Sequence, residues 1–198
     1  MAGGILLVWS ALAAVAVGRS PGPNALDRWG FAALGPTTHS TLLVHISELG
    51  DPAVLAAASV LAAVVVVGRD RRRAVACLVG PAMATVLVEW VVKPAVGRHY
   101  LGVLSFPSGS VTVVASLAAA WTLAVPGWTR WPVAAVGVVL TGSMTVAVIA
   151  LRWHYPSDAL AGAAFGVGMV LLLDGLLHLA AAAAQDRHPA RPGSMSAQ

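Results

Sequence analysis

The sequence predicts an all-α fold, a polytopic membrane protein whose six transmembrane helices form a bundle. Of its 198 residues, 58% are hydrophobic and only 10% are charged, whereas about 25% of the residues in ordinary soluble domains are charged. The mean hydropathy of +0.81 points the same way. Too few polar side chains remain to cover a soluble surface, and the single cysteine, Cys77, excludes a disulfide scaffold.

Six apolar stretches are long enough, or nearly so, to cross a hydrocarbon core, which needs about 20 helical residues. They are residues 2–17, 52–67, 74–92, 111–125, 133–151 and 159–184. No positive residue precedes the first stretch, so it is interpreted as a helix and not as a signal peptide. Residues 1–184 are expected to form one six-helix membrane domain, and the polar residues 185–198 a flexible cytoplasmic tail.

The basic residues predict the orientation of the bundle. With the N-terminus inside, seven arginines fall in cytoplasmic loops and five basic residues fall on the other side. The cluster Arg71–Arg73 between two close spans is typical of a cytoplasmic loop. Both termini are therefore expected inside, with residues 18–50, 93–110 and 152–158 on the outer face. This topological role accounts for the net charge of +4 without a nucleic-acid partner.

The first candidate binding segment follows the third apolar stretch. Lys93 and Arg98 stand five residues apart with Pro94 and Gly97 between them, so both cations can converge on one oxyanion. The alternative is that both side chains only snorkel to the membrane interface. Glu89 precedes Lys93 by four residues and is expected to orient its ammonium on one helix face.

The second segment leads into the fourth apolar stretch. Pro107, Ser108, Gly109 and Ser110 place small residues where the helix is expected to begin. Free backbone N–H groups at the positive end of a helix dipole bind anions, so this start is a candidate phosphate site. The alternative is a plain N-terminal cap.

The third segment joins the fifth and sixth stretches. His154 and Asp158 stand four apart across a helix start, so the carboxylate can hold one imidazole nitrogen and leave the other as nucleophile or base. Arg152 adds a phosphate-binding type of side chain beside them, and this favours function over a capping Asp with an interfacial His. Asp174 and His178, also four apart, are interpreted as a buried pair near the inner end.

These three segments resemble the motifs of the type 2 phosphatidic acid phosphatases, the lipid phosphate phosphatases, whose membrane members are six-helix bundles. The resemblance extends from Pro52 to Gly166. In the first motif Lys93 and Arg98 match, while Tyr100 and Leu101 stand where Arg-Pro is usual.

The other two motifs match with one departure each. In the second motif, Pro-Ser-Gly-His, the first three residues match as Pro107, Ser108 and Gly109, and Ser110 replaces the His. In the third motif His154, Asp158 and the following Gly162 match, but Val148 stands where the family has an Arg. We expect Arg152 to supply that missing charge.

The resemblance implies a phosphohistidine mechanism that needs no metal and no cofactor. His154 would attack phosphorus, and Asp158 would hold the imidazole. The residues expected to bind the phosphoryl oxygens are Lys93, Arg98, Ser108, Gly109, Ser110 and Arg152. In the family the His of the second motif protonates the leaving oxygen, which a Ser110 hydroxyl does poorly, and His99 is the nearest candidate substitute acid in the sequence.

The resemblance therefore predicts a phosphatase-like membrane domain that hydrolyses a polyprenyl or glycerolipid phosphate or pyrophosphate at the outer face of the cell membrane. A pyrophosphate is the expected better substrate, because its leaving phosphate needs little protonation. One alternative is a non-catalytic member that binds a phosphorylated lipid, and another is a phosphotransferase that uses the same His. The expected partners are a phosphorylated membrane lipid and the bilayer; the sequence predicts no particular oligomeric state.

Overall fold

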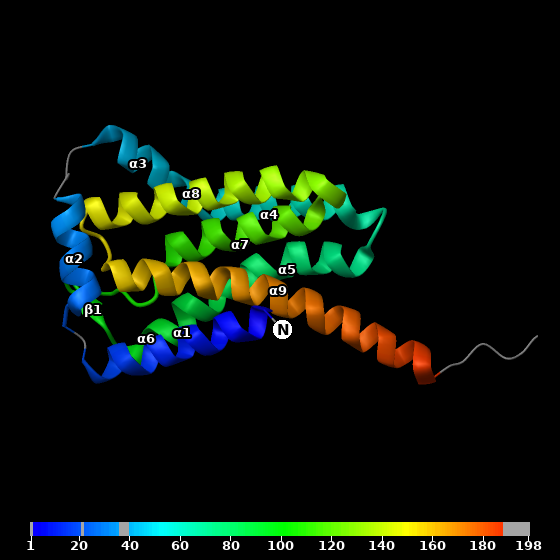
Figure 1. Ribbon diagram of the computed structural model, residues 1–198, viewed down its shortest axis with the longest axis horizontal. Helices are drawn as coiled ribbons and strands as arrows, with labels where there is room; N and C mark the ends of the chain where they lie inside the picture. The colour runs from blue at the N-terminus through cyan, green and yellow to red at the C-terminus, as the bar shows by residue number, and fades with distance from the viewer. Residues whose placement is uncertain (1, 21, 36–39, 188–198) are drawn as a thin grey trace, which may run out of the picture.

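The computed structural model describes residues 2–20, 22–35 and 40–187, and most of these residues are helical (Figure 1). All six apolar stretches lie in helices that pack together in one bundle. These helices are α1 (Ala2–Arg19), α4 (Pro52–Val67), α5 (Arg71–Leu87), α7 (Gly109–Ala124), α8 (Arg130–Ala150) and α9 (Pro156–Arg187). Helix α5 continues through a π-helical turn, η2 (Val88–Val92), into α6 (Lys93–Val96). The all-α fold class is confirmed.

Four helical segments of the described chain are long and apolar enough to cross a membrane, fewer than the six predicted. They are Ala2–Arg19, Arg71–Val96, Gly127–Ala150 and Pro156–Asp186. A fifth is obtained when α4 is joined to the segment Thr41–Gly50, from which it is bent by 54°. Helices α4 and α7 have 16 residues each, and a helix of that length rises about 24 Å, less than a core of about 30 Å.

Residues 18–50, expected to be a loop, contain helices that the apolar pattern did not predict. They are α2 (Ala25–Leu34), α3 (Thr41–Ser47) and the short η1 (Glu48–Gly50). Asn24 caps α2: its side chain accepts from the backbone N–H of Asp27, and the Asp27 carboxylate accepts from the backbone N–H of Asn24. Helix α2 lies across one end of the bundle, which we call the α2 end (Figure 1).

Helix α7 is the centre of the bundle and packs against α4, α5, α8 and α9. Most of its residues are buried, and they are mainly small or β-branched. Glycines on α9 allow the closest approach, because a Cβ on Gly166 would lie 2.5 Å from the Thr112 carbonyl oxygen. A Cβ on Gly162 would lie 2.5 Å from the Ser108 carbonyl oxygen. These two glycines, four residues apart, let the α7 and α9 backbones meet, as small residues do between membrane helices.

The opposite end carries the turn between α4 and α5. Asp70 caps α5 by accepting from the backbone N–H of Arg73 at 3.0 Å. His178 of α9 bonds to the Asp70 carboxylate at 3.0 Å and to the Asp174 carbonyl at 2.8 Å. The predicted Asp174–His178 pair therefore exists, at 3.6 Å between Nδ1 and Oδ1, but it is not buried as predicted, because the His178 side chain is 36% exposed. It belongs to a larger cluster that ties α9 to the α4–α5 turn.

The C-terminal boundary also differs from the prediction. Helix α9 continues to Arg187, so residues 185–187 of the expected flexible tail are helical. The remainder of that tail, residues 188–198, lies outside the described residues.

The close approach of α7 and α9 predicts that Gly166→Ala destabilises the protein. Its Cβ would lie 2.5 Å from the Thr112 carbonyl oxygen and 3.0 Å from the Ser116 nitrogen, both backbone atoms that cannot turn aside. We expect the free energy of unfolding in detergent to fall by about 1–3 kcal/mol, as for other overpacked sites.

Gly175→Ala is the matched control, since it lies on the same helix and has nothing within 4 Å of its Cβ position. This control should be neutral or slightly stabilising. Equal stability of the two variants would contradict the close packing of α7 against α9.

Candidate functional site

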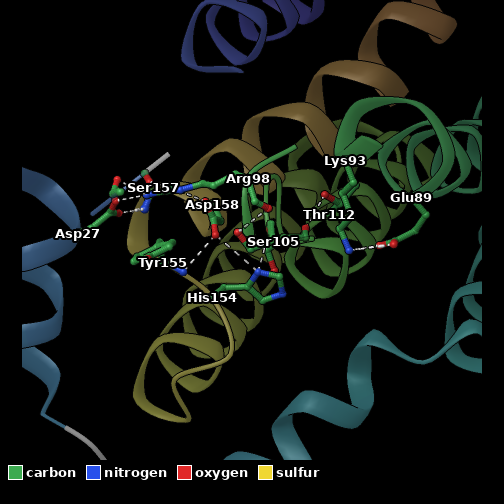
Figure 2. A network of polar contacts seen from close by, with 12 residues as sticks. Asp27, Glu89, Lys93, Arg98, Ser105, Thr112, His154, Tyr155, Ser157 and Asp158 are labelled. Atoms are coloured by element: carbon green, nitrogen blue, oxygen red, sulfur yellow. Dashed lines mark hydrogen bonds and ion pairs between the residues drawn. The ribbon is translucent and has the colours of Figure 1, made fainter. Parts of the chain in front are cut away.

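All three candidate segments meet at the α2 end of the bundle, as the predicted topology requires (Figures 1 and 2). Helix α5 and its extension α6 end there, α7 begins there, and α9 begins after the loop that follows α8. Between α6 and α7 the chain forms a small antiparallel hairpin of β1 (His99–Tyr100) and β2 (Val103–Leu104).

His154 is held by a backbone carbonyl. Its Nδ1 lies 2.9 Å from the carbonyl oxygen of Ser105, which can only accept, so Nδ1 carries the proton of the neutral ring and Nε2 keeps its lone pair. The Asp158 carboxylate, expected to do this, lies 3.8 Å from Nδ1, beyond hydrogen-bond distance. The side chain of His154 is 15% exposed. That one ring nitrogen acts as nucleophile or base stays a prediction, but the residue that orients the ring is Ser105 and not Asp158.

Asp158 instead pairs with Arg98 in a fully buried ion network (Figure 2). Nη1 of Arg98 donates to Oδ1 of Asp158 at 2.5 Å and to the Ser157 hydroxyl at 2.8 Å. Its Nη2 donates to Oδ2 of Asp27 at 2.6 Å and to the Gly22 carbonyl at 3.1 Å. The side chains of Arg98 and both carboxylates have no exposed surface. The network therefore ties α2 and α9 to the chain that follows α6.

Asp27 is a residue of this network that sequence reasoning missed. Burial opposes ionisation of its carboxyl, but hydrogen bonds from Arg98 and Ser157 outweigh burial and lower the pKa of Asp27. The pattern Asn24-x-x-Asp27 could have revealed the helix cap. Nothing local signals the contact with Arg98, which lies 71 residues further along the chain.

Aromatic rings cover the network on one side. The Arg98 guanidinium lies 3.9 Å from the centre of the Tyr155 ring. The rings of Tyr100 and Phe31 have their centres 4.5 Å and 5.7 Å from that of Tyr155. Such stacking of a guanidinium on an aromatic ring is favourable when both groups are desolvated. In this network the Arg98 guanidinium contacts protein groups. Phosphate binding by Arg98 stays a prediction.

The start of α7 departs from the expectation in one detail. The backbone N–H of Ser108 donates to the Asp158 carbonyl at 2.9 Å, so it is not among the amides facing a ligand. The Ser108 hydroxyl, by contrast, is buried and has no hydrogen-bond partner among the described residues. Buried polar groups normally have partners, so an orphaned hydroxyl beside a helix start suits a ligand oxygen.

Ser110 occupies a confined position. A Cβ placed on Gly50 would lie 2.8 Å from the Cβ of Ser110, so η1 passes directly over this side chain. The glycine at residue 50 therefore allows η1 to lie close to the Ser110 side chain.

Lys93 lies at the same helix start. Its Nζ donates to both carboxylate oxygens of Glu89 at 2.7 and 2.8 Å, which confirms the predicted pairing. A Cβ placed on Gly109 would lie 3.6 Å from this Nζ. His154 thus bonds to residue 105 and Lys93 lies beside residue 109, so both side chains lie at the segment 105–109 that leads into α7.

Two predicted site residues make their contacts elsewhere. Arg152 stacks on the Phe31 ring at 4.1 Å and donates to the Phe31 carbonyl at 3.2 Å, so it secures α2. His99 is exposed on the hairpin, and its Nδ1 bonds to the Gly97 carbonyl at 2.9 Å. Among the described residues, the hydrogen bonds of these two side chains are therefore made away from the start of α7.

An apolar groove of about 440 Å³ runs beside α7, between α4 and α8. Its walls include Ala58 of α4, Leu117 and Trp121 of α7, and Val136 of α8. Leu49, next to the Gly50 that covers Ser110, also lines it. The groove therefore extends from the neighbourhood of the α7 start into the apolar part of the bundle.

The arrangement offers a neutral imidazole nitrogen, a lysine, an orphaned hydroxyl and a helix N-terminus, which together suit an anionic group attacked by His154. Among the described residues, no group of three or more His, Cys, Asp or Glu side chains is placed to hold a metal ion.

Comparison with protein-family models, with curated proteins and with solved structures gives no match to this chain.

The buried network predicts a large stability loss for Arg98→Met. This variant keeps much of the side-chain volume but leaves two buried carboxylates, Asp27 and Asp158, without their shared cation. Removing one member of a buried ionic network costs about 3–5 kcal/mol in the free energy of unfolding. Thermal or denaturant unfolding in detergent measures this loss.

Arg28→Met removes the same charge from the exposed face of α2 and serves as control. It should lower the free energy of unfolding by less than about 1 kcal/mol. Similar stabilities for the two variants would show that Arg98 does not hold this end of the bundle together.

Proposed function

We propose that this protein is a membrane lipid phosphatase that hydrolyses a polyprenyl or glycerolipid phosphate or pyrophosphate through a phosphohistidine intermediate. The observation that supports the proposal best is the state of His154. Its Nδ1 proton is engaged by the Ser105 carbonyl at 2.9 Å, which leaves the Nε2 lone pair to act as nucleophile. The start of α7 follows Ser105 by four residues, and a Cβ on Gly109, its first residue, would lie 3.6 Å from Nζ of Lys93.

In the first step, the lone pair of His154 Nε2 forms a bond to phosphorus while the bond from phosphorus to the leaving oxygen breaks. The leaving group departs with that electron pair. The imidazole becomes cationic, and the Asp158 carboxylate at 3.8 Å from Nδ1 stabilises this charge through space. Lys93, the Ser108 hydroxyl and the first amides of α7 would bind the phosphoryl oxygens.

In the second step, water attacks phosphorus and the bond from phosphorus to Nε2 breaks. Inorganic phosphate leaves and Nε2 regains its lone pair. With Ser110 in place of a histidine, this site has a poor acid for the first step, and proton donation is typically worth 10²–10⁴-fold. A pyrophosphate, whose leaving phosphate needs little protonation, therefore fits the site better than a monophosphate. The same proposal includes His99 as the substitute acid. For this role the β1–β2 hairpin has to move toward the substrate.

The groove beside α7 supports a lipid as the substrate. Its lining is almost wholly apolar, it opens between membrane helices, and one end adjoins the loop that covers Ser110. A chain of polyprenyl or acyl type would bury its methylene groups there while the phosphate stays at the α7 start. Phosphate transfer to another acceptor uses the same first step, so the products of the reaction distinguish the two activities.

The proposal predicts that His154→Ala abolishes phosphate release. Without Nε2 no covalent intermediate forms, and the rate should fall by about 10³-fold or more. The assay compares inorganic phosphate released from matched polyprenyl and glycerolipid monophosphates and pyrophosphates by purified protein in detergent. Rapid acid-free quenching with labelled substrate should trap an acid-labile phosphoprotein in the parent protein alone.

His45→Ala is the control, because His45 is exposed on α3 and pairs with Glu48 at 3.3 Å. It should hydrolyse the substrates as the parent protein does. Undiminished turnover by His154→Ala would refute the phosphohistidine mechanism. Binding of the lipids without hydrolysis by any variant would favour the non-catalytic alternative.

The proposal also places the site on the outer face of the cell membrane. Leu101→Cys at the α2 end and Trp128→Cys in the turn η3 (Gly127–Thr129) provide a matched pair, with 80% and 78% exposure of the original residues. In a Cys77→Ala background, a membrane-impermeant thiol reagent applied to whole cells should label the first variant and spare the second. The reverse labelling pattern would put the site on the cytoplasmic face.

A further inference from the structure

The carboxylate of Glu89 has no role in the proposed mechanism, yet it lies at the proposed phosphate site. Glu89 belongs to the π-helical turn η2, and both of its carboxylate oxygens accept from Nζ of Lys93 at 2.7 and 2.8 Å (Figure 2). A π-helical turn inside an α-helix is uncommon and is frequent at functional sites. The Glu89–Lys93 pair is therefore positioned by an uncommon backbone conformation.

The carboxylate also touches the first residue of α7. A Cβ placed on Gly109 would overlap Oε1 of Glu89 and lie 3.6 Å from Nζ of Lys93. Only a glycine fits at residue 109 while Glu89 holds this position. Helix α7 has 16 residues, and its first N–H groups and its dipole favour a negative group at this place. The Glu89 carboxylate thus lies beside the start of α7, where a negative group is favoured.

A second observation indicates that this place is built for a ligand. The hydroxyl of Ser108, the residue before Gly109, is buried and has no hydrogen-bond partner among the described residues. Glu89 satisfies Lys93 but leaves this hydroxyl unsatisfied. The start of α7 thus keeps one polar group without a partner while Glu89 is paired with Lys93.

We propose that Glu89 is an internal competitor for the anion and determines which phosphorylated ligands the site accepts. In the empty site its carboxylate neutralises Lys93 against the start of α7. A phosphoryl group has to displace it, because two anions in one small site repel each other. The Glu89 side chain is 40% exposed, so it has a path to solvent, whereas Lys93 is 13% exposed and stays.

This inference rests on the proposed function and narrows its substrate class. A lipid phosphate has the binding energy of its chain to displace Glu89, but free inorganic phosphate lacks it. The site would therefore reject small phosphates, and the return of Glu89 would help to expel the product.

The test measures binding of inorganic phosphate to Glu89→Gln by titration calorimetry in detergent at fixed pH and salt. Glutamine keeps the size of the side chain and removes its charge. The dissociation constant for phosphate should fall by about tenfold or more, because the like-charge repulsion is gone. Hydrolysis of lipid substrates should show a lower KM for Glu89→Gln and an increased inhibition by phosphate.

Glu48→Gln is the matched control, since it removes one charge at the same end of the protein from a side chain that is 60% exposed. It should leave phosphate affinity within about twofold, because solvent screens an exposed charge. Lys93→Met should abolish the tight binding created in the Glu89→Gln protein. If Glu89→Gln does not fold, Glu89→Asp, whose carboxylate is one methylene further back, should give a smaller gain in affinity.

Phosphate affinity that is unchanged or weaker in Glu89→Gln overturns the inference. Absence of measurable phosphate binding in both proteins overturns it as well. Phosphate binding and lipid hydrolysis, measured together, also test the competitor role of Glu89 separately from the proposed phosphatase activity. Stronger binding without hydrolysis by any variant would support the competitor role and reject the phosphatase. Hydrolysis by the parent protein with no gain in phosphate affinity would do the opposite.

Discussion

A buried guanidinium has to be neutralised within the protein, and this requirement organises the α2 end of the bundle. Arg98 draws one carboxylate from α2 and one from α9, and its ring partner Tyr155 from the loop before α9. The same Asp158 accepts through its backbone carbonyl from Ser108, so the ion network also sets where α7 starts. The orientation of His154 depends on Ser105, whose backbone N–H in turn donates to the Arg98 carbonyl at 2.9 Å. The contacts that neutralise Arg98 and the contact that orients His154 are therefore linked through the same residues.

The charged side chains at the two ends of the bundle differ in how far they are buried. At the α2 end the side chains of Arg98, Asp27 and Asp158 have no exposed surface, and the guanidinium stacks on the Tyr155 ring. At the opposite end Asp70, Arg73, Asp174 and His178 form a looser cluster with partly exposed side chains. Between the two ends, the Thr112 hydroxyl lies 2.8 Å from the Ser108 carbonyl and 3.2 Å from the Gly162 carbonyl of α9. The fully buried cluster of charges thus lies at the end of the bundle where the catalytic site is proposed.

Sequence patterns predicted what local chemistry determines and failed where distant segments meet. The apolar stretches located all six helices of the bundle, because burial in a membrane requires continuous apolar runs; α4 and α7 are nevertheless short of a full span. The spacing of Glu89 and Lys93 correctly gave their ion pair, since residues four apart share a helix face. The partner of Arg98 on α2 and the carbonyl that holds His154 could not be predicted, because a contact across 71 residues and a backbone acceptor leave no side-chain signal. The Ser110–Gly50 contact likewise requires the path of η1, which the apolar pattern does not encode.

The central position of α7 has a consequence for how the protein is made. A helix surrounded by α4, α5, α8 and α9 presents little surface to lipid, and at 16 residues it is short for a membrane span on its own. Its stable place in the bilayer depends on neighbours that are synthesised both before and after it. Insertion of this helix is then a cooperative event completed when α9 arrives, and a nascent chain that ends at residue 125 would hold it poorly. Because α9 also carries Asp158, its arrival completes both the packing of the core and the candidate site.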